Sequence, residues 1–387
     1  MTSWAGETLR LKPGVRSKAE AGHPWILSEE INFEGRAPKD GVAVVYGGGG
    51  QLLGTGFTSS TSRIGWRRFR KDIGILDQAW VEQTLARSIQ GREKMPSRRL
   101  FWSESDGIPG LVVDQYGEYL TVQITTRGVE DSWEIIQEAL VQLTQPKGIL
   151  IRRDASGRKL EGMESLPSEA MGKVPEEPIL VEIGGLSVPV DLRHGQKTGT
   201  YLDQQENYGM VAAVAKGRKV LDLFCHNGGF ALRCAAGGAT EVTGVDRSEP
   251  SLLLARAASL RNNLKIRWAQ EDAIRFLRAS RKGEYDLVIL DPPGLGKSRE
   301  SRDASLHFLA ELHRQALRVL APSGRLATFS CSYRIGSEDL RGMVNRVVKE
   351  EGRNLKVCSV LTQAKDHPVD PNFPESHYLS GLLLEVT

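Results

Sequence analysis

The stretch KVLDLFCHNGGFALRC, residues 219–234, decides the fold. Its apolar beginning, interrupted by Asp222, is typical of a buried strand, and the pair Gly228–Gly229 forms a turn into a short helix. Strand and helix patterns alternate from there to the end of the chain. This alternation predicts an α/β fold with a doubly wound sheet, which binds its ligands at the carboxyl ends of the strands.

Further strands are predicted in this part of the chain, among them EVTGVD (241–246), YDLVILDPP (285–293) and GRLATFSCS (324–332). Each carries near its end a side chain that can take part in chemistry, namely Asp246, Asp291 and Cys331. A helix is predicted after the first of them, with Ser248 as its N-cap. The sheet therefore has several polar side chains where a ligand is expected.

Two smaller units are predicted before this sheet. Residues 1–72 alternate brief apolar runs with glycines, and Gly47–Gly50 can only be a turn, so we expect a small β-barrel. Residues 73–178 combine helical spacing with a strand pair, which predicts a central α+β domain. The doubly wound sheet then occupies residues 179–387, which makes three domains in a chain of 387 residues.

The composition excludes several classes of protein. A hydrophobic share of 40% with 26% charged residues is that of a soluble globular protein. The chain has no run of 18 uncharged apolar residues and no apolar signal core at its beginning, so we expect a cytoplasmic protein. Its four cysteines form no C-x-x-C pair, so neither a metal site nor a disulfide framework is predicted. A net charge of +3 permits an anionic partner without requiring one.

Four acidic side chains fall where the predicted sheet would bind a nucleotide. Asp222 lies in the first strand, and the next three strands end in Asp246, Asp272 and Asp291. A single aspartate of this kind is usually a cap or a turn residue, but four at successive strand ends favour a ligand. A dinucleotide site would show G-x-G-x-x-G, and its pyrophosphate would gain nothing from Asp222. S-adenosylmethionine (SAM) fits better, because its ammonium, ribose and adenine groups each need an acceptor.

The whole chain resembles the bacterial 23S rRNA large-subunit methyltransferase I group of 5-methylcytosine methyltransferases. The N-terminal PUA domain of that family is similar to GHPWILSEEI followed by SRIGWRRFRK, and its central domain is similar to DGIPGLVVDQYGEYLTVQ and RRDASGRKLEGM. Its catalytic domain is similar to KTGTYLDQQ, LDLFCHNGGFAL, LDPPGLGKS, SCS and DHPVDPNFPESHYL. The order of these short strings along one chain is specific, although each string alone is weak. The resemblance implies a PUA domain, an α+β domain and a Rossmann-like methyltransferase domain.

The resemblance also implies a set of residues around SAM. The predicted cofactor-binding residues are Tyr201, Gln204, Asp222, Phe224, Gly228, Gly229, Asp246, Arg247, Asp272, Asp291 and Pro292. The segment from Tyr201 to Gln204 is expected to close over the methionine end of the cofactor. The chain departs from the family pattern after YLDQ, where Gln205 stands in place of a common Arg, and in the turn, where His226 and Asn227 replace a common Tyr-Thr pair. Neither change removes an acidic anchor.

Cys331 is the predicted nucleophile, with Asp291 as its catalytic partner. C5 of cytosine accepts a methyl group only after a thiolate adds to C6 and turns the ring into an enamine. Such chemistry needs a cysteine near the donated methyl group and an acid at N3, and Asp291 is the candidate for that acid. The alternative role for Cys331 is a small buried hydrophobic residue. Cys225 lies in the cofactor turn, and Cys234 and Cys358 occupy positions that suit a core.

A basic stretch closes the first predicted domain. It contains Arg63, Arg67, Arg68, Arg70 and Lys71, interleaved with Trp66 and Phe69. Basic side chains for phosphates and aromatic faces for bases would make an RNA-binding surface. The same pattern also fits a solvated strand edge whose charges prevent aggregation.

The predicted partners are 23S rRNA, naked or in an assembling subunit, and a second copy of the chain in a homodimer. Two other functions compete with cytosine methylation. A methyltransferase for a purine nitrogen often has an aromatic residue after D-P-P that stacks on a flipped base, but here Gly294 follows. A catalytically silent RNA-binding protein would not need all four acidic anchors. His367 is either the base that removes the C5 proton or a turn residue.

Overall fold

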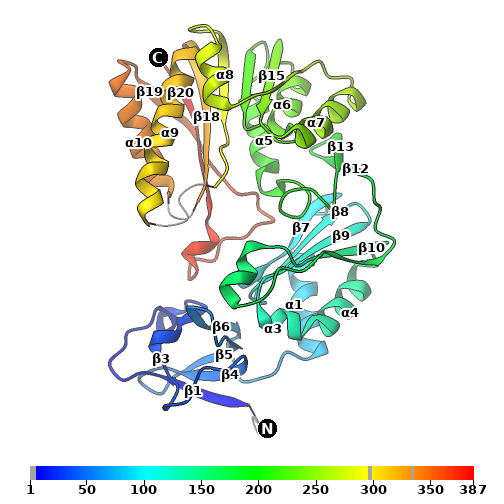
Figure 1. Ribbon diagram of the computed structural model, residues 1–387, viewed down its shortest axis with the longest axis vertical. Helices are drawn as coiled ribbons and strands as arrows, with labels where there is room; N and C mark the ends of the chain where they lie inside the picture. The colour runs from blue at the N-terminus through cyan, green and yellow to red at the C-terminus, as the bar shows by residue number, and fades with distance from the viewer. Residues whose placement is uncertain (1–5, 295–298, 333–334) are drawn as a thin grey trace. The chain divides into compact units, whose positions relative to one another are not determined.

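The computed structural model describes residues 6–294, 299–332 and 335–387. It divides into two compact units, each made of segments that are distant in sequence (Figure 1). The first unit comprises Met1–Glu177, Asp191–Gly199 and Lys365–Ser376, and the second comprises Pro178–Val190, Thr200–Ala364 and His377–Thr387. The division into three domains at residues 72 and 178 therefore stays a prediction. In the described residues no helix is both long and apolar enough to cross a membrane.

The described residues at the start of the first unit form a six-stranded sheet in the order β2-β6-β5-β4-β1-β3. Its strands are β1 (Glu7–Leu11), β2 (Trp25–Leu27), β3 (Ile31–Asn32), β4 (Gly41–Tyr46), β5 (Leu52–Thr58) and β6 (Ile64–Arg70). Neighbours are antiparallel except for the pair β1 and β4. The glycine run forms the turn between β4 and β5, as predicted, and Trp66 is fully buried in the core.

A second sheet of the first unit has the order β11-β10-β9-β8-β7 in its described residues. The strands are β7 (Ser97–Trp102), β8 (Leu111–Tyr116), β9 (Tyr119–Ile124), β10 (Gly148–Arg152) and β11 (Glu169–Gly172). The helices are α1 (Gln78–Gln90), α2 (Ser103–Asp106), α3 (Arg127–Asp131) and α4 (Trp133–Thr144). The apolar faces of α1 and α4 share one core cluster with β7, β8 and β9. The predicted α+β arrangement is confirmed.

A buried polar network joins the distant segments of the first unit. Arg99 donates two hydrogen bonds to Asp114, and Thr198 donates to the same carboxylate at 2.5 Å. Asp366 accepts a hydrogen bond from the backbone N–H of Arg99 at 2.8 Å. Since these groups are buried, the ion pair and its hydrogen bonds hold the segments at residues 191–199 and 365–376 in place.

The second unit contains the doubly wound sheet, with the order β16-β15-β14-β17-β18-β20-β19 in the described residues. Its strands are β14 (Lys219–Leu223), β15 (Glu241–Asp246), β16 (Arg267–Gln270), β17 (Tyr285–Leu290), β18 (Leu320–Cys331), β19 (Leu355–Thr362) and β20 (Leu379–Val386), and the pair β12 (Ile179–Ile183) and β13 (Leu186–Val190) precedes them. The five strands from β16 to β18 are parallel, and β20 is antiparallel to both of its neighbours. The predicted fold class is confirmed.

Helices cover both faces of this sheet (Figure 1). They are α5 (Gln205–Ala212), α6 (Gly229–Ala236), α7 (Glu249–Arg261), α8 (Ala273–Ala279), α9 (Arg299–Val319) and α10 (Ser337–Glu350). Leu221 and Leu223 of β14 pack with α8, α9 and α10, whereas Val220 packs with α5 and α6. Because side chains alternate along a strand, Asp222 points to the same face as Val220, toward α6. Ser248 caps α7, as predicted.

A buried histidine fastens α9 to β18. His313 Nδ1 donates to the carbonyl of Leu309 at 2.6 Å, so its Nε2 is free to accept the hydroxyl hydrogen of Thr328 at 2.9 Å. Burial lowers the pKa of His313 to about 4, because a charged imidazolium would lose its hydration there. The ring is therefore neutral in the folded protein.

We expect this histidine to make the second unit less stable in acid. An unfolded histidine takes up its proton near pH 6.5, whereas folded His313 does so near pH 4. The stabilisation is present above pH 6.5 and decreases toward pH 4, by about 2 kcal/mol between pH 7 and pH 5. The free energy of unfolding is measured by urea titration at pH 7 and at pH 5. The difference between the two values should be smaller by that amount in His313→Gln than in the wild type. The control His307→Gln, an exposed position on the same helix, should keep the wild-type difference, and a wild-type difference in His313→Gln would contradict the prediction.

Candidate active site

Five parallel strands bring the predicted acids and Cys331 to one edge of the sheet. Asp222 lies in β14, Asp246 ends β15, and Asp291 directly follows β17. Cys331 ends β18, and Asp272 follows β16 at the start of α8. The strand order reverses between β14 and β17, since the chain passes from β14 outward to β16 and then returns. Such a switch point is where α/β sheets bind their ligands.

The turn after β14 has an unusual backbone. Phe224 and His226 have φ angles of 61° and 50°, and Gly228 has 87°. Asp246 holds the turn, because its carboxylate accepts hydrogen bonds from the backbone N–H groups of His226 at 2.8 Å and Ser248 at 2.9 Å. Strained φ angles at residues other than glycine persist only where the surrounding structure fixes them. The backbone conformation of this turn, which the sequence predicted to bind a ligand, is therefore fixed by its surroundings.

Gly228 and Gly229 are required by close packing as well as by the turn. A Cβ atom on Gly228 would lie 2.5 Å from the Trp268 ring, and one on Gly229 would lie 2.4 Å from the Tyr208 ring. Both rings are large and partly or fully buried, so neither can move away freely. These aromatic contacts pack the first turn of α6 against Tyr208 of α5 and Trp268 of β16.

Asp222 is fully buried, and its two oxygens differ. Oδ2 accepts a hydrogen bond from the N–H of Ala231 in α6 at 2.9 Å, whereas Oδ1 has no hydrogen-bond partner among the described residues. Burial raises the pKa of Asp222 well above its usual value; the Ala231 bond opposes this, and the charges of Asp291 and Asp246 add to it. A buried acceptor of this kind suits a cationic donor, which would keep the carboxylate ionised. The ammonium group of SAM is such a donor.

Asp272 and Arg247 lie closer to solvent. Asp272 is the N-cap of α8, and its Oδ1 accepts from the N–H of Arg275 at 3.1 Å. Its Oδ2 is 3.9 Å from Nη1 of Arg247, whose side chain is mostly exposed. Asp272 therefore has a structural role at the helix end, and its second oxygen is not needed for the cap.

Gln204, Asp291 and Cys331 form a connected group. Gln204 Nε2 donates to Asp291 Oδ2 at 3.1 Å, and Cys331 Sγ lies 3.9 Å from Asp291 Oδ1. Cys331 is partly exposed, whereas Cys225 and Cys234 are buried and burial raises the pKa of both thiols. Pro292, directly after Asp291, is buried. The structure thus brings together the two residues predicted for catalysis.

Tyr201 packs beside the turn. Its ring meets that of His226 edge to face, with the centroids 5.0 Å apart. Its backbone carbonyl accepts a hydrogen bond from the Tyr208 hydroxyl at 3.2 Å. Burial, followed by the charge of Asp291, raises the pKa of Tyr201, so this side chain is an uncharged phenol. Tyr201 therefore lies at the edge of the site that Asp291 defines.

Sequence reasoning missed Asn207. This buried side chain on α5 bonds to Gln204 and to the carbonyl of Thr362. The only signal in the sequence was its position three residues after Gln204, a helical spacing. The partner carbonyl lies 155 residues away, so no local pattern could reveal it.

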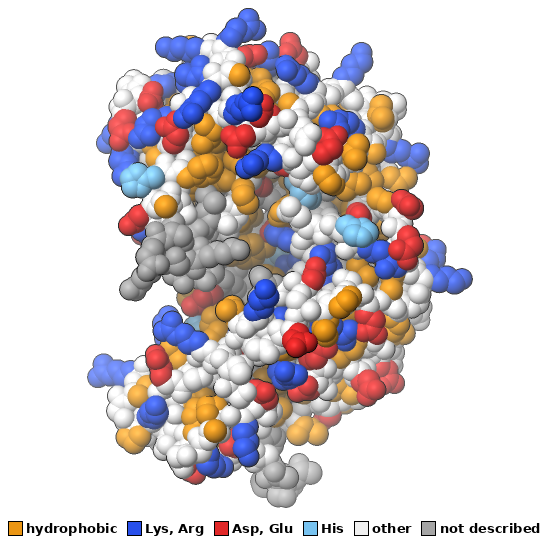
Figure 2. Space-filling view, in the orientation of Figure 1, with side chains coloured by type: hydrophobic (Ala, Val, Ile, Leu, Met, Phe, Trp, Pro, Cys, Tyr) orange, Lys and Arg blue, Asp and Glu red, His pale blue; other side chains and the backbone are white. Residues whose placement is uncertain are grey.

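The predicted RNA-binding stretch separates into two groups. Arg67 contacts Glu104 and Glu161, Arg68 donates to the carbonyl of Gly22, and Arg70 pairs with Asp72. Arg63 and Lys71 are exposed. The interleaved aromatic residues are core residues, since Trp66 is 0% and Phe69 5% exposed, so the expectation that they offer faces to bases is wrong. On the face shown in Figure 2, Lys and Arg are interspersed with Asp and Glu.

His367 is buried in the first unit. Its Nδ1 lies 2.6 Å from Asp366 Oδ1, and its ring packs against Trp102. The same Asp366 accepts from the backbone of Arg99. These contacts give His367 a structural role in the buried polar network described above.

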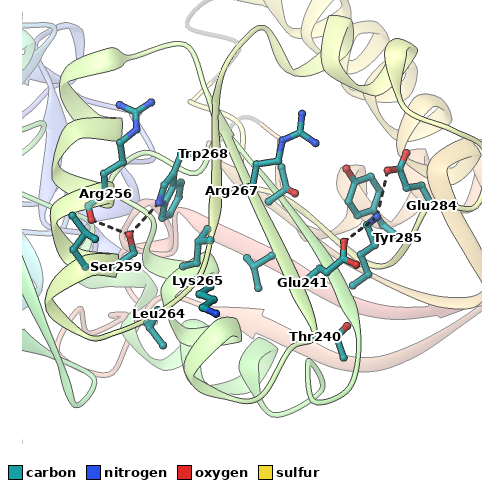
Figure 3. A pocket seen from close by; sticks show the side chains of 15 residues that line it. Thr240, Glu241, Arg256, Ser259, Leu264, Lys265, Arg267, Trp268, Glu284 and Tyr285 are labelled. Atoms are coloured by element: carbon teal, nitrogen blue, oxygen red, sulfur yellow. Dashed lines mark hydrogen bonds and ion pairs between the residues drawn. The ribbon is translucent and has the colours of Figure 1, made fainter.

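A cavity of about 770 Å3 lies at the opposite edge of the sheet (Figure 3). Its lining includes Lys219, Glu241 and Tyr285, which begin β14, β15 and β17. None of the acidic anchors lines it. Trp268 does, and its indole N–H donates to Ser259 at 3.3 Å while the far side of its ring meets Gly228. The cavity is thus distinct from the site at the carboxyl ends.

Comparisons with known proteins agree with this architecture. Residues 134–374 match the family model of S-adenosylmethionine-dependent methyltransferases, and residues 9–71 match that of PUA-like domains. A protein from Streptococcus mutans described as a SAM-dependent methyltransferase has the same fold, with a TM-score of 0.82 at 20% identity over 98% of this chain and 100% of that one. A second structure, which contains bound S-adenosylhomocysteine (SAH), gives a TM-score of 0.83 at 20% identity and the same coverage.

The fold and the family model define a SAM-dependent methyltransferase with a PUA-like domain, and SAM is its cofactor. Two relatives are named ribosomal RNA large subunit methyltransferase I. The protein from Aeromonas salmonicida is 34% identical over 94% of this chain and 95% of its own length, and that from Shewanella frigidimarina is 34% identical over 98% and 99%. The chain belongs to the ribosomal RNA large subunit methyltransferase I family.

The packing of Gly228 against Trp268 gives a stability prediction. Gly228→Ala should lower the free energy of unfolding by about 2–4 kcal/mol, because the left-handed backbone and the contact with the ring both oppose a Cβ atom. The matched control is Gly217→Ala, where φ is also positive but no atom lies within 4 Å of the added carbon. This control should lose only about 1 kcal/mol in the same urea titration. Equal losses in the two variants would show that the Trp268 contact is unimportant.

Proposed function

We propose that this protein forms 5-methylcytosine in 23S rRNA, the RNA of the large ribosomal subunit, through a covalent adduct between Cys331 and C6 of the base. The names of its relatives support the rRNA substrate. The observation that carries the base specificity is the 3.9 Å approach of Cys331 Sγ to Asp291 Oδ1 at the ligand-binding edge of the sheet. A methyltransferase acting on a purine nitrogen would need no cysteine there.

The acidic side chains form the proposed cofactor site. Asp222 would accept from the ammonium group, Asp246 from the ribose, and Asp272 from the adenine amino group through its Oδ2. The remaining proposed contacts are Tyr201, Gln204, Phe224, Gly228, Gly229, Arg247, Asp291 and Pro292. Bound there, SAM supplies a methyl group on a sulfonium centre. The strongest support for this arrangement is the Asp222 oxygen that has no hydrogen-bond partner in the part of the chain that the structure describes.

Cys331 and Asp291 carry the proposed chemistry. The thiol passes its proton to Asp291 and Sγ adds to C6, while Asp291 delivers that proton to N3 as the ring becomes an enamine. C5 is then nucleophilic enough to accept the methyl group. A base removes the C5 proton, the C–S bond breaks, the thiolate leaves and N3 gives up its proton, so that neutral 5-methylcytosine is released. Gly294 follows the D-P-P sequence in place of a stacking aromatic, which also favours cytosine over a purine amine.

The nucleophile is tested with 23S rRNA transcripts and tritiated SAM. Cys331→Ser should reduce methyl transfer to below about one thousandth of the wild-type rate, because a hydroxyl is a far weaker nucleophile. RNA made with 5-fluorocytidine should trap a covalent adduct in the wild type, since fluorine cannot leave C5 as a proton would. The control Cys358→Ser changes an exposed cysteine on β19 and should keep both activities. Full activity in Cys331→Ser, or methylation of a purine, would overturn the proposal.

The proposed RNA contacts of the PUA-like domain are now centred on Arg63 and Lys71. Changing both exposed residues to Ala should weaken binding of a 23S rRNA fragment and flatten its salt dependence by roughly one unit of log–log slope per lost phosphate contact. Lys147→Ala, which removes an exposed cation paired with Glu118, serves as the control. Arg67→Ala should instead lower stability, since it leaves two acidic partners without a cation. An unchanged salt slope in the double variant would favour the solvated strand edge.

A further inference from the structure

The buried amide of Asn207 has a defined orientation. Its Nδ2 lies 2.9 Å from the carbonyl oxygen of Thr362 and 2.6 Å from Oε1 of Gln204. A backbone carbonyl can only accept a hydrogen bond, so the atom facing Thr362 must be the amide nitrogen. Asn207 therefore donates in both directions, and its side chain is 98% shielded because the residue is only 2% exposed.

This orientation determines that of Gln204. Since Asn207 donates to Oε1 of Gln204, the other end of the Gln204 amide, Nε2, faces Asp291 and donates to Oδ2 at 3.1 Å. Both amides therefore donate in the same direction, from α5 toward the carboxylate of Asp291. Hydrogen bonds in such a chain polarise one another, which strengthens the last one.

The direction of these hydrogen bonds makes the two oxygens of the Asp291 carboxylate different. Oδ2 accepts an N–H group, so a proton bound to this carboxyl group cannot lie on the side facing Gln204. A proton on Oδ1 leaves this hydrogen bond intact, and Oδ1 is the oxygen that lies 3.9 Å from Cys331 Sγ. If the Gln204 amide were reversed, its oxygen would face Oδ2. It would then favour a proton on Oδ2, the oxygen that does not face Cys331.

We propose that Asn207 is a positioning residue that acts through Gln204 and keeps Oδ1 of Asp291 as the proton acceptor for Cys331. The inference rests on the proposed cytosine-C5 chemistry. In the adduct-forming step the S–H bond breaks, its proton moves to Oδ1, and the sulfur electron pair forms the bond to C6. The ring electrons shift toward N3, which takes the same proton from Oδ1. One proton is thus moved from sulfur to N3, and no other reactant is needed.

The experiment measures the rate of adduct formation with 5-fluorocytidine RNA at saturating SAM. Asn207→Asp keeps the size of the side chain but can no longer donate, so the Gln204 amide should reverse. The adduct rate at saturating SAM should fall roughly 10- to 100-fold, while the dissociation constant for RNA stays within about twofold. The control Asn262→Ala removes a similar amide at the C-cap of α7, bonded to the backbone of Ser187 in β13 and of Ala258 in α7, and should keep the wild-type rate.

A double-mutant cycle separates positioning from structural damage. In a Gln204→Leu background, Asn207→Asp should add less than about a threefold loss, because its route to Asp291 is already removed. Asn207→Ala, which buries no charge, is tested in the same two backgrounds and should show the same pattern with a smaller loss. Equal losses in both backgrounds, or a wild-type rate in the single variants, would overturn the positioning role. Absence of an adduct in the wild type would overturn the cysteine chemistry itself, and the positioning role with it.

Discussion

The carboxylate of Asp222 lies buried at the centre of the parallel sheet, with one oxygen bonded to α6 and the other without a hydrogen-bond partner among the described residues. Leaving such a group unsatisfied costs roughly 1–3 kcal/mol. The surrounding structure sustains that cost, because Asp246 fixes the turn after β14 and Trp268 packs against its glycine. The folded protein thus contains a buried acceptor that suits a cationic ligand. This acceptor lowers the stability of the protein while no ligand is bound.

The strand ends could be predicted from the sequence, and the side-chain networks could not. Asp246, Asp291 and Cys331 each follow a short apolar run, so alternation of strand and helix was enough to bring them to one edge. The roles of Arg67 and Arg68 depend on partners such as Glu161 and Gly22, which are far away in sequence. A basic side chain that is bonded internally looks the same in a sequence as one that faces RNA.

The segments that make up the first unit could not be predicted either, because their contacts also join residues that are far apart in the sequence. Its five-stranded sheet binds the segments 191–199 and 365–376 through buried hydrogen bonds to Asp114 and from the backbone of Arg99, and these segments interrupt the chain of the second unit. A linear division at one residue cannot describe two units whose segments alternate along the chain. The burial of His367 and Asp366 follows from this arrangement, since both belong to the network rather than to an open loop.

Gln204 illustrates how one residue can connect the two halves of the proposed reaction. It lies next to Tyr201, at the part of the site expected to cover the cofactor, yet its amide nitrogen faces the carboxylate beside Cys331. A residue in that position can respond to a bound cofactor and at the same time orient the group that receives the thiol proton. Adduct formation without a methyl donor would consume the enzyme unproductively. A hydrogen-bond chain that includes a residue of the proposed cofactor site therefore gives a physical route by which cofactor binding and the proposed activation of Cys331 can depend on each other.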